Sequence, residues 1–93
     1  CPIGSFIETD YQYKNKIIRG YQNGELIREG NTIEMLFNVE KIVKYLSTCM
    51  TLFPGDIILT GAPPRVREKI YLSKGDTYSV SVEGLEEITT KFI

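Results

Sequence analysis

The stretch Pro54-Gly55-Asp56-Ile57-Ile58-Leu59-Thr60-Gly61-Ala62-Pro63 decides how the rest of this chain is interpreted. Its opening Pro-Gly pair is a strong turn signal. The apolar run at residues 57–59 is too short for a helix and too apolar for a half-exposed strand. The sequence therefore predicts a core strand that is buried on both faces and flanked by two turns.

The end of this predicted strand is a candidate ligand site. Thr60 offers a hydroxyl, Gly61 permits a positive φ or a close backbone approach, and the proline after Ala62 ends the strand pattern. The alternative is a tight loop that simply leaves a core strand, because glycine and proline punctuate loops in every kind of protein. These residues alone leave both interpretations open.

Length and composition indicate one small globular unit. The chain has 93 residues, of which 42% are hydrophobic, enough for a modest core. A net charge of −1 with interspersed signs gives no basic stripe for nucleic acid and no polybasic patch for a membrane. No apolar run approaches the roughly 20 residues of a membrane span, and no signal-peptide pattern is evident. We therefore expect a cytoplasmic protein without nucleic-acid or membrane partners.

The composition also restricts the chemistry. The chain contains no histidine, which removes the commonest general base, the Ser/His and Cys/His nucleophile arrangements, and most transition-metal sites. Cys1 and Cys49 lie far apart on elements of different predicted type, so we expect free buried thiols rather than a disulfide. The first residue is cysteine rather than methionine, which suggests a processed product or a piece of a longer protein.

Two hairpins are predicted from local signals. Residues 16–22 and 25–29 flank an Asn-Gly dipeptide, which suits the two positive φ angles of a type I′ turn. Their polar arms indicate a sheet with one solvated side. Near the C-terminus, residues 77–82 alternate as a half-buried strand, and residues 88–92 alternate again after a Glu-Gly turn.

One amphipathic helix is predicted to begin after Asn38, a favourable N-cap. Asn31 and Glu34, just before it, have the spacing of a capping box for a short helical turn. Glu40 and Lys44 are spaced for an ion pair on the outer face of the helix. The apolar residues recur along a stripe that we expect to be core: Val39, Ile42, Val43, Leu46 and Met50.

Several short motifs, taken in order, resemble the C-terminal part of the fumarylacetoacetate hydrolase family. Each is short, but their order and spacing together are specific and cover essentially the whole chain. The resemblance implies an α+β, mainly β fold: the C-terminal half of a mixed β-sandwich roll with one amphipathic helix, in which residues 1–93 form the C-terminal part of a catalytic domain. The motifs are Cys1-Pro2-Ile3-Gly4-Ser5-Phe6, Asn23-Gly24-Glu25-Leu26, Gly30-Asn31-Thr32, Met35-Leu36-Phe37, Tyr45-Leu46-Ser47, Pro54-Gly55-Asp56-Ile57-Ile58-Leu59-Thr60-Gly61, Lys74-Gly75-Asp76 and Glu83-Gly84-Leu85.

The resemblance also implies a chemistry. The sequence is most similar to acylpyruvate hydrolases, oxaloacetate decarboxylases and hydroxyheptadienedioate isomerases. Such enzymes bind Mg²⁺ or Mn²⁺ through a Glu-x-Glu pair and a further acid, and the metal stabilises an enolate of a small keto or diketo acid. In the family these ligands, a nearby lysine and a catalytic histidine precede the Cys-Pro-Ile-Gly motif. We therefore expect neither metal ligands nor catalytic residues in this chain.

The Glu8-Thr9-Asp10 segment has the spacing of the family's metal pair. It falls after the Cys-Pro-Ile-Gly motif, however, where the family has a variable loop. We expect it to be a solvated loop rather than a metal site.

The resemblance places a wall of the substrate pocket at Thr60, Gly61 and Ala62. The usual family motif there is Thr-Gly-Thr-Pro, so Ala62 lacks a hydroxyl whose hydrogen bond would contribute about 0.5–1.5 kcal/mol. The glycine-rich loop that normally follows is replaced by a segment containing Arg65 and Arg67. Either arginine could hold a substrate carboxylate or be a solvated loop charge, and the sequence leaves this open.

Two functional hypotheses follow. In the first, the chain is the part of a metal-dependent hydrolase, decarboxylase or isomerase that supplies core and pocket wall. Its partners would be a small keto-acid substrate and a missing N-terminal half, a second copy, or both. In the second, the chain is a truncated or degenerate member that has lost catalysis and keeps a binding or oligomerisation role, which the alanine at position 62 and the altered loop favour.

Overall fold

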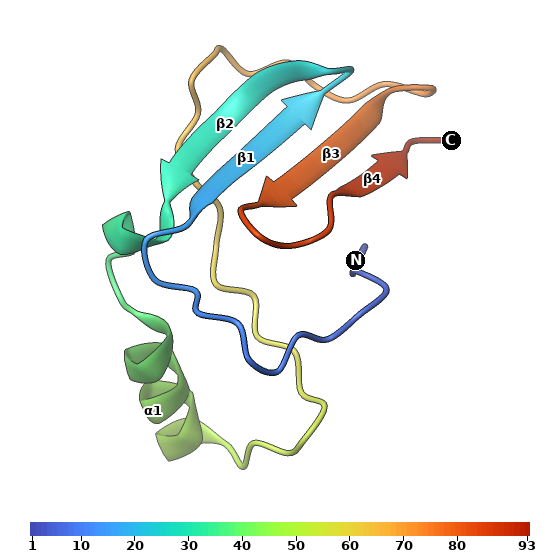
Figure 1. The fold of residues 1–93 in the computed structure, drawn as a ribbon. Coiled ribbons are helices and arrows are strands. Elements are labelled where there is room, and N and C mark those ends of the chain that lie inside the picture. Colours follow the sequence, from blue (N-terminus) through green and yellow to red (C-terminus); the bar gives the residue numbers. More distant parts are fainter.

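The computed structural model describes residues 1–93 and is mainly β (Figure 1). Its four strands form one antiparallel sheet in the order β2-β1-β3-β4. One short 3₁₀ helix and one α-helix complete the structure, which confirms the predicted α+β, mainly β class. The elements are β1 (Ile17–Gln22), β2 (Glu25–Asn31), η1 (Thr32–Glu34), α1 (Val39–Cys49), β3 (Thr77–Val82) and β4 (Ile88–Lys91).

Both predicted hairpins form. The β1–β2 turn has φ of 50° at Asn23 and 81° at Gly24, the left-handed geometry that this dipeptide favours. The β3–β4 connection turns at Gly84, with φ of 84°. Because β1 pairs with β3, the two hairpins join into one sheet.

The predicted helix and its caps are confirmed. Asn38 Oδ1 accepts a hydrogen bond from the backbone N–H of Lys41 at 2.9 Å. Asn31 and Glu34 form the expected capping box at η1. None of the helices has the length and apolar character needed to cross a bilayer.

The predicted pair between Glu40 and Lys44 is wrong. Glu40 instead accepts a hydrogen bond from the Tyr13 hydroxyl and pairs with Lys14 at 3.7 Å. Residues 13 and 14 therefore contact the first turn of α1 and supply partners that helical spacing does not reveal.

The prediction of a buried core strand at residues 57–59 is also wrong. Residues 57–59 form no strand, and Ile57 and Leu59 are 65% and 80% exposed. Their segment runs from the helix toward the sheet (yellow in Figure 1). A strand needs a hydrogen-bonding neighbour, and none of the four strands pairs with this run.

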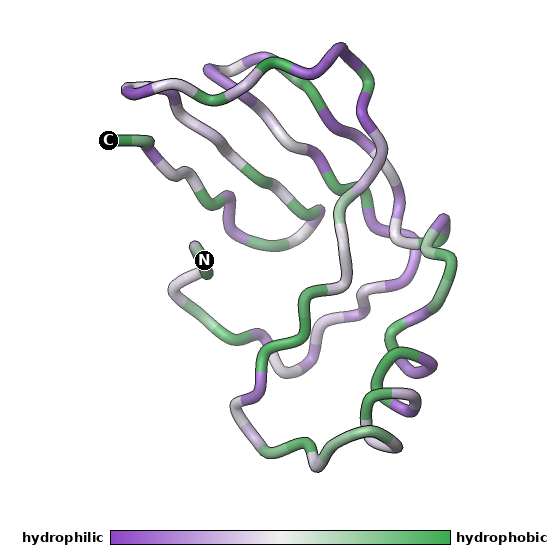
Figure 2. Tube along the Cα trace, turned by 180° about the vertical axis from the view of Figure 1, so that it is seen from behind, coloured by the Kyte–Doolittle hydropathy of each residue, from purple (hydrophilic) through white to green (hydrophobic).

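Burial in this chain is shallow. Gly20 and Gln22 of β1 are the two buried residues, and no hydrophobic side chain is buried. The helical stripe expected as core is therefore only partly covered. Cys1 and Cys49 are free, as predicted, but they are exposed rather than buried. Figure 2 shows hydrophobic and hydrophilic residues alternating along the helix, and a hydrophobic stretch in the segment that runs from the helix back to the sheet.

Candidate substrate pocket

The outer edge of β2 is covered by residues 63–66. The N–H of Glu29 donates to the Pro64 carbonyl at 3.3 Å, and the N–H of Val66 donates to the Ile27 carbonyl at 3.0 Å. Arg28 Nη1 adds a 2.6 Å hydrogen bond to the Pro63 carbonyl. These contacts hold the segment that follows Ala62 against the middle of β2.

A hollow of about 290 Å³ lies beside this junction. The three predicted substrate-binding residues, Thr60, Gly61 and Ala62, all line it. Gly61 has φ of 97°, so the chain turns here in a conformation that favours glycine. The opposite wall comes from the end of β2, from η1, from the segment leading into α1 and from the first turn of α1, with Gly30, Asn31, Thr32, Glu34, Met35, Leu36, Phe37 and Ile42.

Sequence reasoning missed the polar residues on the opposite wall. Asn31 was identified as part of a capping box, and Asn31 and Thr32 as part of a family motif, but neither was predicted to line a site. In the structure Thr32 Oγ1 donates to the Tyr13 carbonyl at 2.6 Å, and Glu34 Oε2 accepts from the N–H of Asn31 at 3.3 Å. The fold thus uses much of their hydrogen-bonding capacity, and Thr60 supplies the other hydroxyl in the lining.

The remaining candidate residues lie outside this hollow. Glu8 Oε1 accepts from the N–H of Asp10 at 3.0 Å, and both residues are exposed, as expected for a loop. Arg67 pairs with Glu25 at 2.9 Å. Arg65 and Arg67 line a second pocket, so the structure does not bring them together with Thr60.

The residues present do not fit a divalent cation. Mg²⁺ and Mn²⁺ prefer several oxygen ligands, yet Glu34 is the single carboxylate in the lining of the hollow. Nowhere in the chain do three or more His, Cys, Asp or Glu side chains come together in a metal-binding group.

The two carboxylates whose pKa values are lowered stabilise the fold and do not belong to the hollow. The hydrogen bond from Tyr13 lowers the pKa of Glu40. Hydrogen bonds from the Asn23 side chain and the Ser73 backbone lower the pKa of Asp76. Both carboxylates lie outside the hollow and join separate segments of the fold.

The four-stranded sheet, the helix and the hollow at the end of β2 define a mainly β protein with one candidate binding site. The family model described as fumarylacetoacetate (FAA) hydrolase, C-terminal, matches residues 1–93. The chain therefore belongs to the fumarylacetoacetate hydrolase family, as the resemblance of its motifs predicted.

Several relatives share this region. The chain is 42% identical over 85 residues to an uncharacterized protein of Methanocaldococcus jannaschii, covering 91% of this chain and 35% of that protein. It is 35% identical over 100 residues to the mitochondrial oxaloacetate tautomerase FAHD2A of Homo sapiens, covering 100% and 32% respectively. The chain thus spans about a third of the length of these curated relatives.

Solved structures show the same fold. The 5-carboxymethyl-2-hydroxymuconate delta-isomerase of Mycobacterium smegmatis superposes with a TM-score of 0.91 at 35% identity, over 100% of this chain and 36% of that one. The 2-hydroxyhepta-2,4-diene-1,7-dioate isomerase of Mycobacterium marinum gives 0.88 at 34% identity with the same coverage. These matches confirm the predicted fold.

Proposed function

We propose that this chain is the C-terminal part of a catalytic domain that acts on a small keto or diketo acid. In this proposal Thr60, Gly61 and Ala62 form one wall of the substrate pocket. The observation that carries it is the hollow in which these three residues meet the end of β2 and η1. The names of the relatives, an oxaloacetate tautomerase and two isomerases of unsaturated hydroxy acids with two or three carboxylates, support the substrate class.

The reaction would be hydrolysis, decarboxylation or isomerisation through an enolate. Mg²⁺ or Mn²⁺, when bound, would stabilise the negative charge of that enolate. Because the acids of this chain do not fit such an ion, the proposal assigns its ligands to residues outside the chain. The role left to this chain is to shape the pocket and orient the substrate. The proposal includes a cytoplasmic location, which fractionation of cells would test.

A second candidate function is binding or oligomerisation without catalysis. Two substitutions relative to the family motif favour it. Ala62 brings no hydroxyl into the hollow, and Arg67 is engaged by Glu25 at 2.9 Å rather than turned to the hollow.

The test compares Ala62→Thr with Ala62→Val in the protein that carries this chain. Valine has nearly the volume of threonine without its hydroxyl, so the pair separates a hydrogen bond from a change of shape. We expect Ala62→Thr alone to change KM or the preference between oxaloacetate and acylpyruvates by up to about tenfold. Affinity for divalent metal should stay unchanged in both variants.

Two results would count against the first proposal. If Ala62→Thr alters only thermal stability and leaves the kinetic constants untouched, Ala62 lies outside the site. If the unaltered protein turns over none of these acids with Mg²⁺ or Mn²⁺ present, the non-catalytic candidate is favoured.

A further inference from the structure

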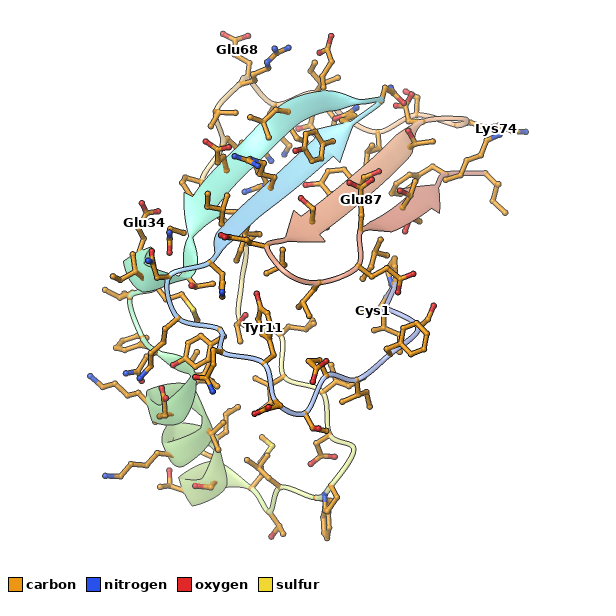
Figure 3. The ribbon with its side chains drawn as sticks, in the orientation of Figure 1. Cys1, Tyr11, Glu34, Glu68, Lys74 and Glu87 are labelled. Atoms are coloured by element: carbon orange, nitrogen blue, oxygen red, sulfur yellow. The ribbon has the colours of Figure 1, made fainter.

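A second pocket, of about 240 Å³, lies where residues 65–72 pass beside β2 and the sheet. It shares no lining residue with the proposed substrate pocket. Figure 3 shows the separation: Glu34 belongs to η1, next to the end of β2, whereas Glu68 lies at the top of the view, above the sheet. This second pocket is called the basic pocket below.

The lining of the basic pocket is strongly cationic. Four of its residues carry positive charge and one, Glu68, carries negative charge, on a chain whose net charge is −1. A concave surface lined by one sign of charge concentrates ions of the opposite sign. The cationic residues are Arg28, Arg65, Arg67 and Lys69.

Two of these cations are already engaged by the protein. Arg67 pairs with Glu25 at 2.9 Å, and Arg28 donates to the Pro63 carbonyl at 2.6 Å. Arg65 takes part in none of the three ion pairs of the chain. Its backbone is fixed by the antiparallel bridge to Arg28, so its guanidinium is tethered at the pocket while its charge is not neutralised.

Two tyrosines shape the pocket. Lys69 Nζ lies 4.4 Å from the ring centroid of Tyr71, which steadies the ammonium group without cancelling its charge. The Tyr78 hydroxyl lies 2.8 Å from the position that a Cβ on Gly20 would take, and that position is 3.4 Å from Arg28 Cβ. The absence of a side chain at Gly20 thus lets a phenolic hydroxyl approach the base of Arg28, adding a neutral hydrogen-bonding group to the cationic lining.

We propose that the basic pocket binds a small anion that carries a carboxylate or a phosphate group. Arg65 is the principal contact, because its planar fork of donors matches the oxygens of either group and has no partner in the protein. Lys69 provides a second charge. This proposal does not depend on the proposed function of the hollow beside Thr60.

The test is calorimetric titration of the protein that carries this chain with inorganic phosphate and, separately, with malonate, at constant ionic strength. We expect saturable binding of at least one probe, weakened about tenfold or more by Arg65→Ala. The matched control is Arg19→Ala, because Arg19 is paired with Glu29 at 2.6 Å and is absent from the basic pocket. The affinity of the Arg19→Ala variant for either probe should equal that of the unaltered protein.

The two probes separate the sources of the anion. Binding of malonate alone points to an organic acid, binding of phosphate alone to a phosphorylated compound, and binding of both to the shared oxyanion chemistry. No saturable binding of either probe overturns the proposal. The proposal is also overturned if Arg65→Ala and Arg19→Ala weaken the affinity for the probe equally. The anion would then be attracted by the overall charge of the protein and not by the basic pocket.

Discussion

Gly30 and Pro63 are in such close contact that a Cβ atom on Gly30 would lie 2.8 Å from Pro63 Cβ. The same added atom would lie 3.2 Å from Pro64 Cδ. Real Cβ atoms do not tolerate the shorter distance, so position 30 must be glycine for residues 63–64 to lie against β2. The wall of the hollow beside Thr60 depends on this contact.

We expect Gly30→Ala to displace residues 63–64 and to lower the free energy of unfolding by about 1–3 kcal/mol, the usual cost of overpacking. The ligand affinity of the hollow should fall together with stability. Thermal unfolding of the protein that carries this chain measures the first effect. The control is Gly4→Ala, whose Cβ would meet Ile88 Cδ1 at an ordinary 3.6 Å and should change stability by less than about 0.5 kcal/mol. Equal stability of the two variants would contradict this prediction.

Asp76 should make stability depend on pH in the acid range. Its carboxylate accepts hydrogen bonds from Asn23 Nδ2 at 3.0 Å and from the N–H of Ser73 at 2.8 Å, and these lower its pKa from the ordinary 3.8. A lowered folded-state pKa means that the stabilisation is fully present above the unfolded value and is lost as the pH falls through the folded value.

The measurement is Tm as a function of pH, from neutrality to below pH 3.8. Asp76→Asn, which cannot ionise, should lower Tm at neutral pH and make the acid fall shallower. Asp10→Asn, in an exposed loop, serves as the control for removing one carboxylate. If the Tm of Asp76→Asn decreases at acid pH as steeply as that of the unaltered protein, other groups determine the pH dependence of stability.

The 93-residue chain by itself should show no divalent-metal-dependent turnover of oxaloacetate or acylpyruvates. It has no histidine base, and no three acids converge into an oxygen cage. The assay uses chain prepared free of any longer protein, with and without Mg²⁺. Turnover that disappears on adding a chelator would refute the prediction and require metal ligands within these residues.

Local chemistry accounts for most of what the sequence predicted correctly. The turn at Asn23-Gly24 depends only on residues next to it in the sequence, and so does the cap at Asn38. Both formed as expected. The prediction of a buried strand at residues 57–59 was wrong because burial depends on residues distant in the sequence, which a short apolar pattern does not specify. The predicted ion pair between Glu40 and Lys44 was wrong for the same reason, because the partners of Glu40 are Tyr13 and Lys14, which are distant in the sequence.

The candidate site was predicted on one side only. Thr60, Gly61 and Ala62 were found because they form a motif in one continuous segment. The facing residues Asn31 and Glu34 come to the hollow through the fold. Their sequence signals, a helix cap for both and a family motif for Asn31, did not point to a site.

We predict that the isolated chain does not persist as a monomer. No hydrophobic side chain is buried, and large ones such as Phe6 and Leu36 are 84% and 87% exposed. Surfaces of this kind associate in water, and either a second copy or an N-terminal partner would cover them. Sedimentation at micromolar concentration should give at least twice the chain mass of 10.6 kDa. A concentration-independent monomer that unfolds cooperatively would contradict this.

The two prolines beside β2 have a consequence for aggregation. An open sheet edge is a template for another chain, but Pro63 and Pro64 have no N–H to donate, and the Val66 amide already occupies the Ile27 carbonyl. The β2 side of the sheet is therefore closed to strand addition. The other edge, β4, is four residues long, so fibril-like growth of this chain would have to start from Ile88–Lys91, and a charged or proline substitution there would be the one to block it.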